Sequence, residues 1–290
     1  MIIIICFLHK ILCMKKTTFI LATLMAIIGF NADAQSTRKL NNVLNLKMTS
    51  FKGAHGATVA WHPIQKKYYA ATAGNVSHQM GVFDAKGKML SNKDQATLFD
   101  VRGLWYNPST KTLQSNGYND YGWAEYKLNA GGMPVSIKTL FAEMNQPDEQ
   151  SVGAFDSKNK AVYFFDNSTG NLAKYAMEDG TFTETIDLHL GFKDEDEMSD
   201  AVTYDNADAK DNYNSSSLVY TGIQGAEIGL LNTSGFENKR IELYNISTGF
   251  LTRILSLPEN APEASFLDFG YSNGIYWLFD TEKRIWKGYK

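Results

Sequence analysis

The chain has 290 residues and a formal net charge of −3 at pH 7, and 44% of its residues are hydrophobic and 13% aromatic. A chain of this length and apolar content can bury a full hydrophobic core. Its slightly acidic balance argues against a nucleic-acid partner, because such a partner requires a basic surface.

Residues 1–34 are predicted to be a signal peptide. Residues 14–30 supply a basic start followed by an apolar stretch, and residues 32–34 fit the small-residue pattern of a cleavage site. We expect Met14 to be the true start of translation and residues 35–290 to form one mature domain. The protein is therefore expected to be periplasmic or secreted.

Removal of this leader changes the composition of the chain. Both cysteines, Cys6 and Cys13, lie in the leader, so the mature protein can form no disulfide and use no thiolate. It retains 25 basic and 30 acidic residues, a net charge of −5. The apolar stretch of the leader is short for a membrane span, and no later stretch approaches one. We expect a soluble monomer that is stabilised by packing alone.

A repeated unit of four short strands organises the mature chain. Residues 151–188 show it most clearly, as four β-rich runs separated by polar turns, and Asp179-Gly180 in the last turn suits a tight hairpin. An aromatic residue before the first turn marks each copy. The markers, spaced by 45, 49, 49 and 65 residues, are Trp61, Tyr106, Phe155, Tyr204 and Phe269. A period of this length with four strands per unit predicts the blades of a β-propeller.

The fifth unit is incomplete, and this predicts how the ring closes. Residues 284–289 begin its third strand, and the chain ends there. Residues 43–51 alternate like a strand and are expected to supply the missing outer strand, which removes two exposed sheet edges. The prediction is an all-β, five-bladed propeller. Six blades remain the alternative if the long fourth unit holds a further blade, and a β-sandwich is disfavoured because sandwiches lack a fixed period.

Two phrases carry a resemblance to known propellers. VAWHPIQKKYYA, at residues 59–70, and LWYNPSTKTL, at residues 104–113, resemble the repeat of the YVTN, NHL and WD40-like propeller groups. No unit carries the Trp-Asp ending of a true WD40 repeat. The resemblance implies the fold and no single activity, because these groups share an architecture but not a chemistry.

Candidate catalytic and metal-binding residues cluster in the loops before the first strands. In a propeller of strands A to D, the D-to-A and B-to-C loops gather at one end of the central channel, here named the N-terminal mouth because the inner strands begin there. Acidic side chains recur in these loops, and oxygen ligands around an axis suit Ca²⁺. The metal candidates are Asp100, Glu149, Asp200 and Glu263, and the catalytic candidates are His55 and Arg102. The alternative is that these acids are ordinary solvated loop residues.

The B-to-C loops of the same mouth contain a candidate ligand surface. Aromatic side chains beside hydrogen-bonding groups suit a glycan or a peptide. The candidates are His78, Tyr118, Asn119, Asp120, Tyr121 and Trp123. The alternative is that these aromatic residues only pack over the neighbouring blade.

One motif is set aside. Residues 270–274 match the G-x-S-x-G string of serine hydrolases, but no histidine follows Ser272, and the segment is predicted to be a tight hairpin turn.

Two functions of different classes follow from these patterns. The first is an exported, non-catalytic propeller that binds a glycan, peptide or protein at the N-terminal mouth. The alternative is a Ca²⁺-dependent hydrolase or lactonase-like enzyme, in which the acids hold the ion and His55 or Arg102 lies near the reacting group.

Overall fold

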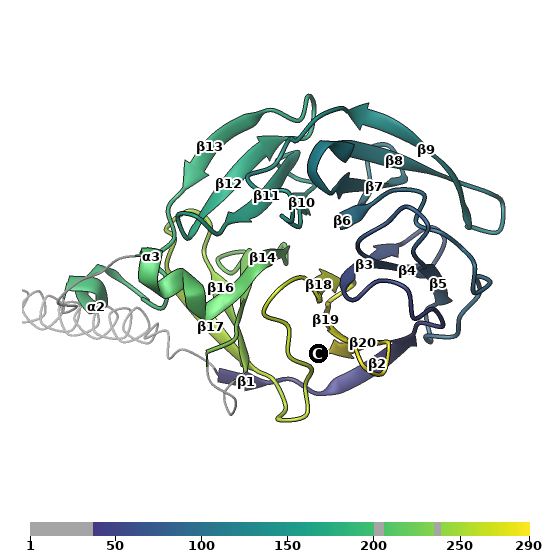
Figure 1. The fold of residues 1–290 in the computed structure, drawn as a ribbon. Coiled ribbons are helices and arrows are strands. Elements are labelled where there is room, and N and C mark those ends of the chain that lie inside the picture. The colour runs from purple at the N-terminus through teal and green to yellow at the C-terminus, as the bar shows by residue number, and fades with distance from the viewer. Residues whose placement is uncertain (1–36, 200–205, 235–238) are drawn as a thin grey trace, which may run out of the picture. The chain divides into compact units, whose positions relative to one another are not determined.

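The computed structural model describes residues 37–199, 206–234 and 239–290. The unit from Thr37 to Lys290 contains five sheets arranged radially around a central channel (Figure 1). The predicted five-bladed propeller is therefore confirmed, and the described residues form no sixth sheet.

Each blade lists its strands from the channel outward. Blade one is β3 (Gly56–His62), β4 (Lys67–Thr72) and β5 (Met80–Asp84); blade two is β6 (Val101–Asn107), β7 (Thr112–Gly117), β8 (Trp123–Leu128) and β9 (Pro134–Phe141); blade three is β10 (Ala154–Asp156), β11 (Ala161–Asp166), β12 (Asn171–Ala176) and β13 (Phe182–Ile186). Blade four is β14 (Tyr213–Tyr220), β15 (Ile228–Asn232), β16 (Arg240–Tyr244), β17 (Leu251–Ser256) and β1 (Thr37–Lys39); blade five is β18 (Phe269–Ser272), β19 (Ile275–Asp280), β20 (Ile285–Tyr289) and β2 (Asn42–Lys47).

The core lies between the blades. Each inner sheet is covered on both faces, so second strands such as β11 and β19 bury nearly every residue, whereas the outer strand β13 stays largely exposed. Buried apolar side chains form five clusters, one at each junction between neighbouring blades. Burial of this apolar surface is the main stabilising contribution to the ring.

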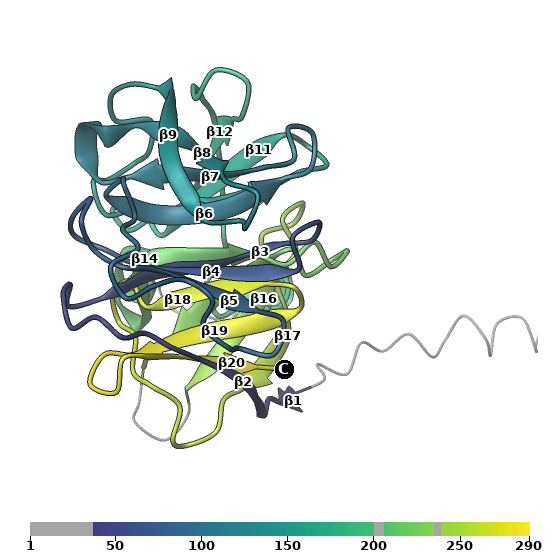
Figure 2. The same ribbon diagram turned by 90° about the vertical axis from the view of Figure 1, so that its right-hand side faces the viewer.

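The ring closes as the sequence predicts. Strand β2 pairs antiparallel with β20, and Leu46 lies opposite Trp286 (Figure 2). Both side chains are fully buried in the cluster between blades five and one. The first strands of the chain thus complete its last sheet.

A second N-terminal strand, which the sequence analysis did not predict, extends the closure. Strand β1 pairs parallel with β17, with Arg38 opposite Leu255. The chain then crosses from blade four to blade five and continues as β2 (Figure 1). The N-terminal segment therefore ties two neighbouring blades together.

The fourth unit differs from the prediction. Its proposed marker, Tyr204, lies outside the described residues, and Leu218, which was expected in a second strand, lies in the inner strand β14. Residues 221–239, expected to be one loop, contain β15. The cause is an insertion before β14 that carries the helices α2 (Glu195–Ser199) and α3 (Asn206–Ala209) and moves this blade further along the chain.

Short helices are confined to the connections between strands. Two 3₁₀ turns, η1 (Asn119–Tyr121) and η2 (Lys210–Asn212), join these α-helices in the loops. Among the described residues, no helix has the length and apolar character needed to cross a membrane.

Candidate functional site

The inner strands run in the same direction around the channel, as the parallel bridge between Val152 and Ser217 of neighbouring blades indicates. They therefore begin at one mouth and end at the other, which we call the C-terminal mouth. The residues proposed from the sequence lie at the N-terminal mouth.

His55 forms a pair with a residue that the sequence analysis did not select. Its Nδ1 lies 2.7 Å from Oδ2 of Asp268, and Oδ1 of Asp268 accepts a hydrogen bond of 2.5 Å from the backbone N–H of Gly56. The side chain of His55 is 40% exposed and that of Asp268 only 3%. The hydrogen bond to Asp268 raises the pKa of His55, whereas burial raises the pKa of Asp268. The pair could hold and orient a proton at the channel mouth.

Arg102 and Asp100 come together, as a buried ion pair. Nη1 of Arg102 donates a 2.8 Å hydrogen bond to Oδ1 of Asp100, which also accepts a bond from the N–H of Gly74. Nε of Arg102 donates to Gln150, and the guanidinium lies 4.7 Å from the ring centre of Tyr118. The charges of these two candidates are therefore balanced within the protein.

The other metal candidates are dispersed. A hydrogen bond to Glu149 raises the pKa of Tyr118, while Glu263 pairs with Lys239 at 3.6 Å. Asp200 lies outside the described residues. Within the described ranges, no three His, Cys, Asp or Glu side chains are placed so that they could hold a metal ion. The calcium site stays a prediction.

The candidate ligand residues divide between the core and the surface. Trp123 is fully buried, and its Nε1 donates a hydrogen bond to the carbonyl of Asn145. Nδ1 of His78 donates to the carbonyl of Ala73, within its own loop. Tyr121 is 45% exposed and packs edge-on against Phe99. The remaining exposed or partly exposed candidates are Tyr118, Asn119 and Asp120, in or beside η1.

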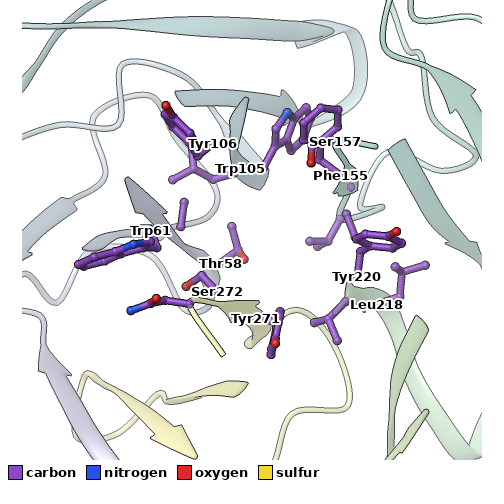
Figure 3. A pocket seen from close by; sticks show the side chains of 18 of the residues that line it. Thr58, Trp61, Trp105, Tyr106, Phe155, Ser157, Leu218, Tyr220, Tyr271 and Ser272 are labelled. Atoms are coloured by element: carbon purple, nitrogen blue, oxygen red, sulfur yellow. The ribbon is translucent and has the colours of Figure 1, made fainter. Parts of the chain in front are cut away.

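The C-terminal mouth contains a cavity of about 280 Å³ that residues from all five blades line (Figure 3). Five aromatic side chains surround it, each at the last or second-last position of an inner strand. We call these residues the aromatic cup: Trp61, Tyr106, Phe155, Tyr220 and Tyr271. Figure 3 shows them arranged in a ring around an open centre.

A second aromatic ring holds each residue of the cup. Partners of neighbouring strands or blades lie behind them at centroid separations of 4.5 to 6.0 Å. The pairs are Trp61 with Tyr68, Tyr106 with His62, Phe155 with Trp105, Tyr220 with Tyr163, and Tyr271 with Tyr276. Such packing restricts the rotamers of the cup before a ligand arrives, which lowers the entropic cost of binding.

The polar groups of the cavity wall are uncharged. Among the described residues that line it, none has a charged side chain, and the hydrogen-bonding groups belong to Thr58, Ser157, Ser272 and Asn273 together with the tyrosines. Oγ of Ser272 accepts a hydrogen bond from Nε1 of Trp277, and Nδ2 of Asn273 donates to the hydroxyl of Tyr68. These bonds fix two of the polar groups in place.

The sequence contained a signal for the cup that was used only to count blades. Trp61, Tyr106 and Phe155 are three of the markers, whereas Tyr220 was placed in a second strand and Tyr271 in the G-x-S-x-G segment. That segment forms the predicted hairpin turn, because Asn273 and Gly274 both have positive φ angles, of 54° and 73°.

Comparisons with solved structures show a likeness of fold. One match is a gluconolactonase from Xanthomonas campestris, with 12% identity and a TM-score of 0.40 over 84% of this chain and 78% of that chain. A chain of a nidogen/laminin complex has 13% identity and a TM-score of 0.39 over 78% and 73%. A chain of a mitotic checkpoint complex has 14% identity and a TM-score of 0.35 over 79% and 62%. A scan against protein-family models finds no match, and neither does a search of curated proteins.

Proposed function

We propose that this protein is an exported, non-catalytic propeller that binds an uncharged ligand in the aromatic cup. The observation that carries the proposal is the convergence of five aromatic side chains, one from each blade, around a cavity of about 280 Å³ without a charged wall residue. Ligand pockets typically combine apolar and aromatic walls with a few fixed polar groups. Export rests on the leader-like sequence of residues 1–34.

This proposal moves the ligand site away from the N-terminal mouth, where the sequence analysis placed it. Asp100 and Arg102 neutralise each other there, and Trp123 belongs to the core. A protein partner could still use the exposed surface around Tyr121, but the polar groups of that mouth do not enclose a comparable aromatic cavity among the described residues.

A thermal-shift screen tests the proposal. The panel contains neutral methyl glycosides, blocked uncharged peptides and tetramethylammonium, and it is applied to the wild type, to the double variant Tyr106→Ala/Tyr271→Ala and to the control Tyr121→Ala. A ligand that binds only the native state raises the melting midpoint. We expect at least one compound to stabilise the wild type and the control but not the cup variant. Stabilisation that survives in the cup variant, or no stabilisation by any compound, would overturn the proposal.

One observation favours a second candidate function, hydrolysis at the N-terminal mouth. His55 is paired through Nδ1 with the buried Asp268, while the side chain remains 40% exposed, an arrangement that suits a general base. In this version, Ca²⁺ would be held by acids such as Asp100, Glu149 and Glu263. Hydrolysis of lactones or esters that disappears in His55→Ala, together with a melting midpoint that rises with Ca²⁺ and falls with EDTA, would support it; absence of both would exclude it.

A further inference from the structure

The walls of the aromatic cup determine the direction from which a ligand can enter. The cavity touches Thr58 of blade one, Leu104 of blade two, Val152 beside blade three, Leu218 of blade four and Gly270 of blade five. All five sides are therefore closed by inner strands, as Figure 3 shows for the labelled side chains. A ligand must approach along the channel axis from the C-terminal mouth. Such a cup accepts the end of a chain or a protruding group, whereas an extended groove would accept the middle of a polymer.

The charge of the wall restricts the ligand further. A carboxylate or ammonium group that loses water inside a pocket needs an opposite charge or several hydrogen bonds in compensation. The described residues that line the cup supply no opposite charge. A free peptide end carries a charged amine or carboxylate at neutral pH and is therefore disfavoured.

The mixture of aromatic rings and hydroxyl groups distinguishes the remaining classes. A purely apolar group would leave the hydroxyls of Thr58 and Ser157 and the amide of Asn273 without the water they had before binding. A quaternary ammonium ion can interact with aromatic faces but can neither donate nor accept a hydrogen bond. A pyranose ring presents apolar C–H faces to the aromatic side chains and hydroxyls to the polar groups.

The size of the cavity agrees with one such ring. Pockets for drug-sized ligands occupy about 300 to 1,000 Å³, and the cup, at about 280 Å³, lies just below this range. We infer that the cup binds the terminal neutral pyranose of a glycan, end-on. This inference rests on the proposed function, since it names the ligand class of the same site.

Isothermal titration calorimetry tests the inference with methyl pyranosides of neutral hexoses, pentoses, 6-deoxyhexoses and N-acetylhexosamines. Each hexoside is compared with the uronic acid of the same configuration, and each binder with its disaccharide and trisaccharide. We expect at least one neutral glycoside to bind, the matched uronic acid to bind at least about tenfold more weakly because its carboxylate lacks a partner, and the longer oligosaccharides to bind within about threefold of the monosaccharide because only the end enters.

Variants locate the binding. Trp61→Ala and Tyr271→Ala should each weaken it by about 2- to 10-fold, the range expected for loss of one aromatic contact, while Trp61→Phe should restore most of it and Tyr121→Ala should leave it unchanged. Melting midpoints near that of the wild type show that the variants fold. If tetramethylammonium or a blocked peptide binds in a Trp61-dependent way and no neutral glycoside does, the inference is wrong and the proposed function stands. If glycoside binding ignores both cup variants, or if nothing binds, both are wrong.

Discussion

Leu46 lies opposite Trp286 in the ladder between β2 and β20, so residues near the two ends of the domain form one sheet. Both side chains are fully buried between blades five and one. The seam of the ring therefore depends on an apolar contact as well as on backbone hydrogen bonds.

Leu46→Ala should weaken this seam. Loss of a buried leucine side chain typically lowers the free energy of unfolding by about 2 to 5 kcal/mol. The matched control is Val43→Ala on the same strand, whose side chain is 51% exposed and which should change stability by less than about 0.5 kcal/mol. Urea unfolding followed by tryptophan fluorescence measures both. Equal effects of the two substitutions would show that the seam is not a stability determinant.

Arg284 should stabilise the loop that follows β2. Its guanidinium donates hydrogen bonds to the carbonyls of Ser50, Lys52 and Gly53, at 3.2, 2.9 and 2.8 Å. Lysine cannot reproduce this planar set of donors. We expect Arg284→Lys to lower the free energy of unfolding by about 1.5 to 3 kcal/mol and to speed amide exchange in residues 50–56.

The neighbouring Lys283 provides the control for this prediction. Its side chain is 66% exposed and lies 3.5 Å from Asp280, so Lys283→Ala should cost at most about 1 kcal/mol. Unchanged amide exchange in residues 50–56 of Arg284→Lys would contradict the proposed role of the guanidinium.

Much of this fold could be predicted because its determinants are local. Alternating runs, polar turns and a chain end inside a unit sufficed for five blades and for the pairing of residues near Leu46. Strand β1 was missed because all three of its residues are exposed, so burial leaves no pattern in its sequence. The insertion before β14 was missed because the spacing of Tyr204 resembled the repeat by coincidence.

The site was harder to predict than the fold because it consists of contacts between distant residues. Tyr271 and Trp61 meet only after the ring closes, and Asp268 approaches His55 only because blade five returns to blade one. Each aromatic position of the cup is visible in the sequence, but its convergence on one cavity is a property of the closed ring.

Glu242 should be a stability determinant of blade four. It is fully buried, and its carboxylate accepts hydrogen bonds from the hydroxyls of Tyr213 and Tyr244 and from Nε of Arg240, at 2.6 to 2.7 Å. Removal of one partner from a buried charged network typically costs about 3 to 5 kcal/mol. We expect a loss of this size for Glu242→Ala in urea unfolding.

A surface ion pair gives the comparison for Glu242. Glu184 pairs with Lys174 and its side chain is 54% exposed, so Glu184→Ala should cost no more than about 1 kcal/mol. If the two alanine variants unfold at the same urea concentration, the buried network does not contribute as the geometry indicates.

His55 should make stability depend on pH. Asp268 raises its pKa in the folded state, so protonated His55 stabilises the fold. This contribution is fully present below the unfolded pKa of about 6.5 and is lost as the pH rises through the higher folded pKa. It should be at most about 1 kcal/mol because the side chain is 40% exposed.

His55→Gln isolates this dependence. Burial lowers the pKa of His62, which gives the opposite slope as the pH falls, and Arg284 near the pair keeps its charge throughout. The difference in unfolding free energy between the wild type and His55→Gln should therefore shrink as the pH rises above 6.5. A difference that is constant from pH 6 to pH 9 would exclude the proposed pairing.

The rings behind the aromatic cup should affect ligand binding without touching the ligand. Tyr276 lies 4.8 Å from Tyr271, centroid to centroid, and is 5% exposed. Tyr276→Leu removes this support and should let Tyr271 sample other rotamers, which weakens the binding of the cup ligand by about 2- to 5-fold through the cost of ordering one side chain. Tyr276→Phe keeps the ring and should bind like the wild type. Calorimetric titration of the two variants with the best glycoside measures this effect, and equal affinities would show that the second ring does not hold Tyr271 in its binding position.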